Sequence, residues 1–472
     1  MEKAAAAQAA AGVGVEAFTA THATASAAFR STGDLMGFLA GASRHGLPAC
    51  EGFACLQSYV AAPDPAYRWN DSGVRLAGTT GGGSSTSGNV RWTGHVLNMT
   101  SQEWLSHLDV GHTEWSHALV VVIPDNLEGP PSRAAGWATL YISFGAYGTA
   151  RGPPISALSS DDPDVNAAAA VAARTGAPAA VLFGVPPEVK IVEDERSRNE
   201  DDLLSYAQQR FLRTFGAQRW IVELPMAKAV VRAMDTIEAF SAAQLPAEIR
   251  NFTVMGTSKR GLATWHAAAV DPRVLAIVPM VRTLNSSAFL RKTVRSYGGM
   301  PVVAVPYMTP ELVEAAKEEP ELVTRLQSVL DPVSYPERFT NVAKLVVDAA
   351  RDDFFMPDHT STWWTKIPGP KAHLVVPDGG HIVGAQQVAK LAAPISAFIR
   401  ARMLGEAPPP LSWSLDATKG QIVAALPAGA PRPTRVELWQ ARTCDATRRD
   451  FRIRNFDRGA ACARGGVPLA VP

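Results

Sequence analysis

Three residue types that together perform nucleophilic catalysis occur in this chain in a fixed order: Ser258, then Asp352 or Asp353, then His381. A serine hydroxyl is a poor nucleophile until a base takes its proton. A histidine is a better base when a carboxylate fixes its tautomer and stabilises its cation. If the fold brings these side chains together, the chemistry would be acyl transfer through a covalent serine intermediate.

The serine lies within residues 251–265, which read NFTVMGTSKRGLATW. Phe252 to Met255 favour a short buried strand, Gly256 permits a sharp turn, and apolar residues recur at helical spacing from Leu262 onward. A serine between a strand and a helix is typical of the nucleophile elbow, although the usual elbow reads G-x-S-x-G and this one reads GTSKRG. The alternative is that Ser258 caps the helix and carries out no chemistry.

The acid and the histidine each follow a predicted strand. KLVVDAA precedes RDDFFMPD, and HLVVPD precedes Gly-Gly-His. Asp352 is the first acid after its strand, while Asp353 and Asp358 are alternatives that could be surface acids or helix caps. We predict that His381 is the general base, because it follows a strand and a glycine pair, and that His359 is the alternative.

Backbone N–H groups near the serine would hold a developing oxyanion. Lys259, which begins the elbow helix, is one predicted donor. Ala146 is the other, because it lies in the turn SFGAYG after the strand predicted at residues 138–144. A plain exit from the strand into a loop is the alternative for that turn. Lys259 and Arg260 also place positive charge beside the serine, which would favour acidic substrates, but outward salt bridges to helix acids are the use that we expect.

Strand and helix patterns alternate along most of the chain, which predicts an α/β fold with a mostly parallel sheet covered on both faces, of the α/β-hydrolase kind. Residues 282–342, which are rich in proline, should form a helical insertion that acts as a lid or as extra scaffold. The expected strands are 95–99, 118–123, 138–144, 179–185, 252–255, 275–281, 343–350 and 372–377. The expected helices are 159–176, 196–212, 226–237, the elbow helix and 388–399.

The 472 residues, 47% of them hydrophobic, can form one large core and a smaller accessory domain. We predict a targeting or disordered extension at residues 1–50, a main domain at 55–405 and a small β-sandwich-like domain at 406–472. The tryptophans of that last domain, Trp413 and Trp439, are expected in its core, with carbohydrate stacking as the alternative. Residues 78–88, GTTGGGSSTSG, should be a flexible surface loop.

Charge and cysteine usage exclude several classes of function. Lys and Arg total 45 against 44 acidic residues, so no global basic field recruits nucleic acid. No run of 18 apolar residues is present, which argues against a transmembrane segment. No C-x-x-C motif occurs, and we expect no structural zinc, no other metal and no cofactor. Disulfides and buried free thiols are both open for the four cysteines, Cys50, Cys55, Cys444 and Cys462.

From about residue 57 to 455 the chain resembles the PhoPQ-activated pathogenicity-related protein family. The resemblance is carried by LQSYVAAPDPAYRW, MTSQEWL, RNEDDLLSYA, LPMAKAVVRAMDTIEAF, GTSKRGLATWHAAAVDPRVLAIVPMV, RSYGG, DDFFMPD, VELWQA and RRDFR. It implies an α/β-hydrolase fold with an appended C-terminal β domain, and a triad of Ser258, Asp352 and His381. It also implies export, because members are often exported and include a secreted proliferation-repressing signal.

Two functions follow from the residues and the resemblance. The first is a serine hydrolase of esterase or peptidase type, with a small-molecule or peptide substrate. The alternative is a secreted signalling or binding protein on a hydrolase scaffold, with a cell-surface receptor as its partner and no need for turnover. A secreted or extracytoplasmic location is favoured by the resemblance, and an organellar one is the alternative.

Overall fold

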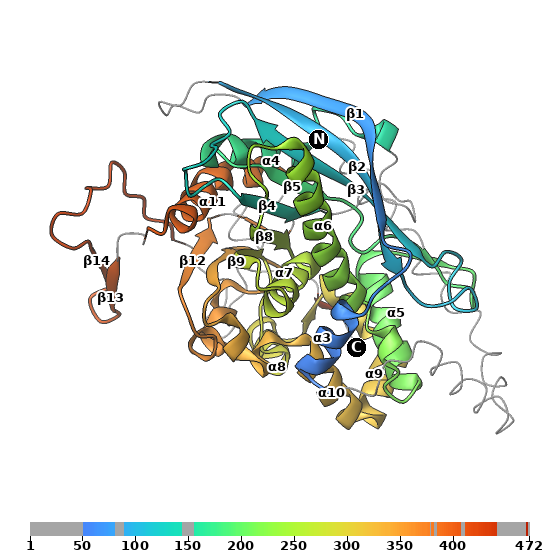
Figure 1. Ribbon diagram of the computed structural model, residues 1–472. Helices are drawn as coiled ribbons and strands as arrows, with labels where there is room; N and C mark the ends of the chain where they lie inside the picture. Colours follow the sequence, from blue (N-terminus) through green and yellow to red (C-terminus); the bar gives the residue numbers. More distant parts are fainter. Residues whose placement is uncertain are drawn as a thin grey trace, which may run out of the picture. The chain divides into compact units, whose positions relative to one another are not determined.

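The computed structural model describes residues 51–80, 89–143, 155–377, 379–381, 385–406, 411–440 and 469–470. Its centre is a nine-stranded sheet in the order β1-β2-β3-β5-β4-β8-β9-β11-β12 (Figure 1). Neighbouring strands from β5 to β12 run parallel, and β1, β2 and β3 add an antiparallel edge. The strands are β1 Arg68–Thr80, β2 Val90–Glu103, β3 Glu114–Pro124, β4 Trp137–Ile142, β5 Ala179–Leu182, β8 Asn251–Thr257, β9 Val274–Met280, β11 Ala343–Ala349 and β12 Lys371–Val376. This topology confirms the predicted α/β-hydrolase fold.

Helices cover both faces of the sheet, as the near-continuous apolar strands predict (Figure 1). One face is covered by α3 Phe53–Ala61, α6 Glu223–Gln244 and α7 Lys259–Val270, and the other by α4 Pro163–Thr175 and α11 Ala385–Leu404. Alternation along β4 serves both layers: Leu140 packs in the core beneath α6, whereas Tyr141 packs in the core beneath α4.

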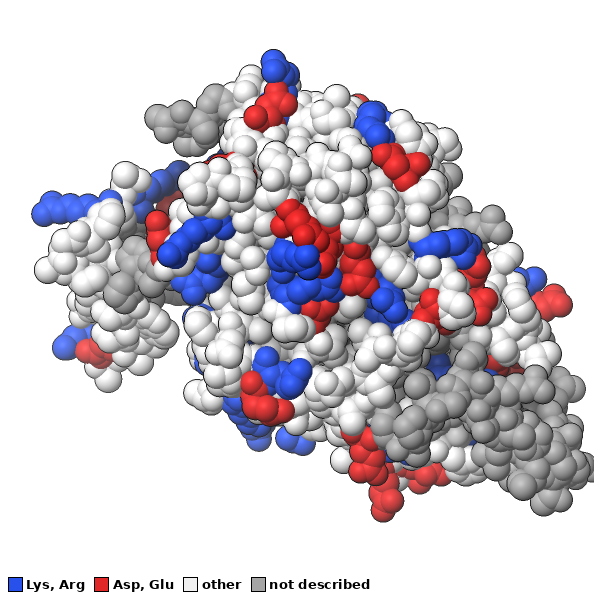
Figure 2. Space-filling model, in the orientation of Figure 1, with Lys and Arg blue, Asp and Glu red and all other residues white. Residues whose placement is uncertain are grey.

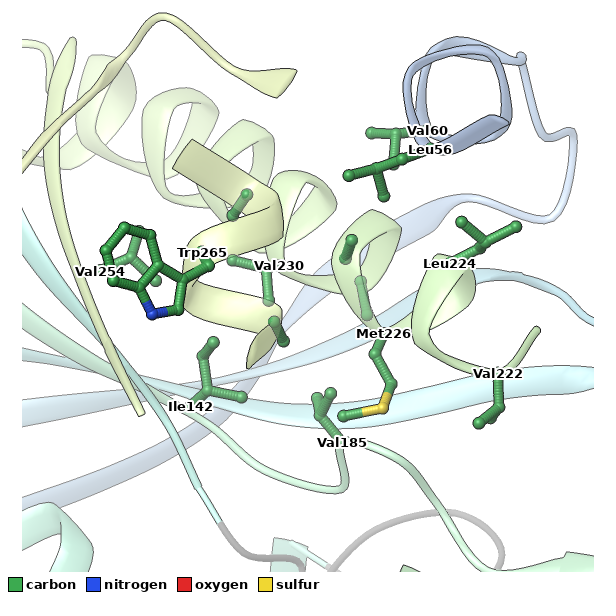
Figure 3. Packing of buried hydrophobic residues seen from close by; sticks show 14 of the residues in the cluster. Leu56, Val60, Ile142, Val185, Val222, Leu224, Met226, Val230, Val254 and Trp265 are labelled. Atoms are coloured by element: carbon green, nitrogen blue, oxygen red, sulfur yellow. The ribbon is translucent and has the colours of Figure 1, made fainter. Parts of the chain in front are cut away.

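The apolar stripe of α6 is buried as its spacing predicts. Met226 and Met234 are fully buried core residues. Figure 3 shows Met226 of α6 among the packed side chains of one core cluster, together with Leu56 of α3 and Trp265 of α7. The methionines of this helix are therefore packing residues and belong to no binding surface.

The long connection between β9 and β11 is helical, as predicted. Its helices are α8 Ser286–Tyr297, α9 Pro310–Glu318 and α10 Pro320–Leu330, with shorter 3₁₀ turns at Val302–Met308, Pro332–Ser334 and Pro336–Phe339. Pro310 and Pro320 each lie in the first turn of a helix, where a missing N–H costs nothing. Helix α5, Glu200–Arg213, packs against this insertion through Ser205, whose hydroxyl donates to the carbonyl of Pro306.

Strand β1 was not predicted. It carries polar residues and Gly73, and its pairing with β2 shifts register between Asp71 and Arg75, so neither β-propensity nor alternation is strong there. The strand also includes Gly78 to Thr80, which the sequence placed in a surface loop; residues 81–88 of that loop lie outside the described residues.

Small antiparallel sheets occupy the C-terminal part of the chain. Strands β13, Ser412–Asp416, and β14, Gln421–Ala425, pair with each other, and β15, Leu469–Ala470, pairs with β10, Met300–Pro301. The prediction that the tryptophans are core residues is wrong, because Trp413 and Trp439 are 69% and 62% exposed. Trp413 belongs to β13, and the two-stranded hairpin of β13 and β14 has no second layer against which to bury it. The sandwich-like domain and its boundaries stay predictions, and residues 1–50 lie outside the described residues.

Cys55 is disulfide-bonded, which answers the question of disulfide or free thiol for this residue. Cys50, Cys444 and Cys462 lie outside the described residues. Within the described ranges, no helix combines the length and the hydrophobicity needed to cross a bilayer. On the face shown in Figure 2, Lys and Arg side chains are interspersed with Asp and Glu, in keeping with the net charge of +1.

Candidate active site

Ser258 lies at the junction of β8 and α7 with φ 54° and ψ −122°. A positive φ is strained for a residue with a side chain, and such strain is typical of functional turns. The serine N–H donates to the carbonyl oxygen of Met280 on β9, 2.8 Å away. Ser258 occupies the N-cap position of α7, as the alternative has it, but its side chain makes no capping hydrogen bond to the helix.

The unusual spacing of the glycines follows from close packing at the turn. A Cβ on Gly256 would lie 2.7 Å from the carbonyl oxygen of Arg260, and a Cβ on Gly261 would lie 3.0 Å from the Cβ of Arg282. The first distance is too short for any side chain, and the second requires Arg282 to shift by a few tenths of an ångström. A glycine is therefore favoured at position 261, one residue later than in the usual elbow, where Arg282 approaches α7 just after β9.

His381 joins the serine to the acid. The Ser258 hydroxyl lies 2.9 Å from Nε2 of His381, and Nδ1 of the same ring lies 3.0 and 3.1 Å from the two carboxylate oxygens of Asp352. The imidazole can accept the serine proton on Nε2 while it donates Nδ1–H to the carboxylate. The structure thus brings together the serine, acid and histidine that the sequence proposed.

The carboxylate of Asp352 is buried and held from several sides. Its Oδ1 accepts hydrogen bonds from the N–H groups of Phe354 and Phe355, at 2.7 and 2.8 Å. The hydroxyl of Tyr297, from α8, donates to the carbonyl of Asp352. The loop of the acid is tied to that of the histidine, because the N–H of Arg351 donates to the carbonyl of Gly379.

Two aromatic rings shield the imidazole. The rings of Phe354 and Phe355 lie 5.3 and 5.5 Å from that of His381, the first nearly parallel to it. The side chain of His381 remains 18% exposed, whereas that of Asp352 is fully buried. A buried acid behind a partly accessible base suits a triad, because the reacting proton lies at the accessible end.

The alternative acids and base occupy other positions. Asp358 is paired with Lys292, at 3.1 Å. His359 is buried against the edge of Phe289, and burial lowers its pKa to about 4. It is His381, and not His359, that hydrogen-bonds the serine hydroxyl.

Of the two predicted oxyanion donors, Lys259 lies within the described residues. Lys259 is the first residue of α7, where backbone N–H groups have no partner within the helix. Ala146 lies outside the described residues. Strand β4, which ends four residues before it, places Ile142 beside Gly256 of β8.

The charges that follow the serine are neutralised by helix acids, but the salt bridges are buried and not outward as expected. Lys259 lies 2.8 Å from Glu200 and 3.1 Å from Asp201, and Arg260 also binds Glu200. Burial raises the pKa of Glu200, but the charges of Arg260 and Lys259 more than reverse this effect and lower it to about 2. Arg260 also donates to the carbonyl of Val185.

Sequence reasoning missed Arg282, which follows β9 by two residues. Its guanidinium lies over the ring of Phe355, 5.3 Å from the ring centre, and burial lowers its pKa. Its position directly after a strand that neighbours the elbow strand is the signal that could have identified it.

In the described ranges, no group of three or more His, Cys, Asp or Glu side chains is arranged to hold a metal ion.

The chain is similar to several known proteins. Residues 57–452 match the model of the PhoPQ-activated pathogenicity-related proteins. Autocrine proliferation repressor protein A of Dictyostelium discoideum is 29% identical over 406 residues, which are 84% of this chain and 76% of that protein. Acetyl xylan esterase 1 from Thermoanaerobacterium is similar with a TM-score of 0.38 and 15% identity, over 77% of this chain and 99% of that one. Glucuronoyl esterase from Solibacter usitatus gives 0.42 and 12%, over 74% and 91%.

Proposed function

Because the chain belongs to the PhoPQ-activated pathogenicity-related protein family and carries a hydrogen-bonded serine, histidine and aspartate, we propose that it is a serine hydrolase acting on an ester or a peptide bond. One observation carries the proposal: hydrogen bonds run without a break from Asp352 through His381 to the hydroxyl of Ser258. The strained backbone of the serine supports it further.

In the proposed mechanism, Oγ of Ser258 attacks the substrate carbonyl as Nε2 of His381 takes its proton. Asp352 stabilises the imidazolium that forms, and the N–H groups of Lys259 and Ala146 hold the oxyanion. The imidazolium then gives its proton to the leaving group as the acyl bond breaks. Water, deprotonated by the same imidazole, attacks the acyl-serine, releases the acid and restores the hydroxyl.

A fluorophosphonate probe tests the proposal, since it reacts covalently with an activated serine. The folded full-length chain should be labelled at Ser258, and labelling should disappear in Ser258→Ala and fall strongly in His381→Ala. Ser287→Ala, which alters an exposed serine of α8, is the matched control and should be labelled like wild type. A folded wild-type protein that the probe leaves unlabelled would overturn the proposal.

A second candidate rests on the similarity to autocrine proliferation repressor protein A. In this alternative the chain is a secreted signal that binds a cell-surface receptor without turnover. The disulfide at Cys55 supports an oxidising, extracytoplasmic location. If folded Ser258→Ala represses the proliferation of responsive cells as well as wild type does, signalling is independent of hydrolysis; if repression disappears with the hydroxyl, the second candidate fails.

A further inference from the structure

The positively charged side chains near the serine differ in whether an acid neutralises them. The charges of Lys259 and Arg260 are both taken up by Glu200 and Asp201. Arg282 differs, because within the described residues its guanidinium has neither a hydrogen bond nor an ion pair, and its buried Nε has no partner. A buried hydrogen-bond donor without a partner destabilises the folded protein, which makes Arg282 a candidate for binding a ligand.

Acids near Arg282 do not neutralise it directly. Tyr307, Asp331, Glu223 and Asp201 act on it only through space. Asp331 already accepts the N–H groups of Asn285 and Ser286, and Asp201 is paired with Lys259 and accepts from Tyr307. Burial raises the pKa of Glu223, which favours its neutral form.

The position of Arg282 relates it to the reacting groups. Its Cβ lies against Gly261 of the elbow helix, and it follows by two residues the Met280 carbonyl that accepts the Ser258 N–H. The ring centre of Phe355 lies 5.3 Å from the guanidinium carbon of Arg282 and 5.5 Å from the ring centre of His381. The ring of Phe355 thus neighbours both the cation and the base.

We infer that Arg282 binds a carboxylate on the acyl part of the substrate, so that the preferred substrates are esters of dicarboxylic acids that keep one acid free. The inference rests on the proposed function, whose site it deepens. A guanidinium binds a carboxylate through two parallel hydrogen bonds. A single cation without an ion pair among the described residues matches a monoanion, whereas a phosphate dianion carries one charge more.

The test compares two esters of similar shape, the mono-p-nitrophenyl ester of glutaric acid and p-nitrophenyl 5-methylhexanoate, with the Ser258→Ala rate subtracted as background. Wild type should show a kcat/KM about tenfold or more higher for the glutarate ester. Arg282→Gln should lower that value about 10- to 100-fold and change the neutral ester less than about threefold. Arg282→Lys should be intermediate. Arg291→Gln, which removes the same charge from an exposed position on α8, should match wild type.

Binding without turnover separates this inference from the proposed function. Monomethyl glutarate should bind Ser258→Ala measurably by calorimetry, and about tenfold or more weaker once Arg282→Gln is added. Equal wild-type rates on the two esters, an equal loss on both in Arg282→Gln, or tighter binding of inorganic phosphate would each overturn the carboxylate assignment while labelling of Ser258 persists. If Ser258 is not labelled, hydrolysis fails and the calorimetry still decides the role of Arg282. If Arg282→Gln does not fold, the wild-type ester preference and Arg282→Lys provide the decision.

Discussion

At the scale of single residues, the choice between adjacent acids is decided by hydrogen bonds. Asp352 is buried, accepts two backbone N–H groups and faces Nδ1 of His381. Three donors converge on this carboxylate, which fixes its orientation. The hydrogen bonds that His381 makes to an acid go to Asp352, and Asp353 follows it in an irregular loop.

Replacement of the acid should separate the two neighbours. Asp352→Asn should lower kcat about 1,000-fold or more, because an amide at this position favours the wrong tautomer of His381. Asp353→Asn is the matched control and should stay within about threefold of wild type. Steady-state kinetics on any ester that the protein hydrolyses provides the measurement, and a larger loss from the Asp353 change would place the acid there.

Glu200 is a second residue whose contribution to stability depends on its partners. Glu200→Gln should lower the free energy of unfolding by about 3 kcal/mol, since it leaves Lys259 and Arg260 buried without their shared counter-charge. Urea unfolding measures the change. Asp202→Asn, in the same first turn but 53% exposed, should cost less than about 1 kcal/mol. Similar losses for both variants would contradict a buried ion cluster.

At the scale of elements, the elbow works because β8, α7 and the exit of β9 meet without side chains between them. Gly256 and Gly261 provide that space. The closeness lets the Met280 carbonyl hold the serine N–H and keeps Ser258 at a positive φ. The helix insertion contributes to the same place, because Tyr297 of α8 binds the loop of the acid.

A methyl group at the elbow should therefore damage reactivity as well as stability. Gly256→Ala should cost about 1–3 kcal/mol, because its Cβ would meet rigid backbone atoms of Arg260. The rate of fluorophosphonate labelling should fall in protein that is still folded. Gly111→Ala, whose Cβ would make ordinary contacts at 3.5 Å, is the control. Unchanged labelling in Gly256→Ala would show that the elbow tolerates displacement.

At the scale of the whole molecule, buried histidines link stability to pH. His117, His266 and His359 are buried, and burial lowers the pKa of each to about 4. In the unfolded chain each would titrate near 6.5, so between 6.5 and 4 the unfolded state binds more protons than the folded state. Stability is therefore complete above about 6.5 and is lost as pH falls through this window.

His266 provides the test of this linkage. The free energy of unfolding should fall between about pH 7.5 and about pH 5, and His266→Gln should make the fall smaller by about 1–2 kcal/mol. Glutamine can still donate to the Leu330 carbonyl, which lies 2.9 Å from Nε2 of His266, but it does not titrate. His107→Gln, at an exposed position, should leave the slope unchanged. Equal slopes in wild type and His266→Gln would contradict the linkage.

Much of the fold was predictable because its signals are local. Continuous apolar runs identified β3, β4, β9 and β11, and Asp162 and Gly176 marked the ends of α4 through a side-chain cap and a left-handed residue. Where the local signal is weak, prediction failed: β1 is polar and bulged, and the exposed Trp413 was expected in a core. Whether a residue is buried depends on what packs against it, and the type of the residue does not determine this.

The sequence alone indicated that strands and helices alternate, although it missed β1, and it placed Ser258, Asp352 and His381 after the ends of parallel strands, which meet at one edge of a sheet. Only the tertiary structure decided which acid faces the histidine, that Lys259 and Arg260 are neutralised in the interior, and that Nε of Arg282 has no partner among the described residues. Periodicity and turn residues act over a few positions along the chain. Hydrogen bonds and charge pairing depend on distances of a few ångströms between segments that are remote in sequence.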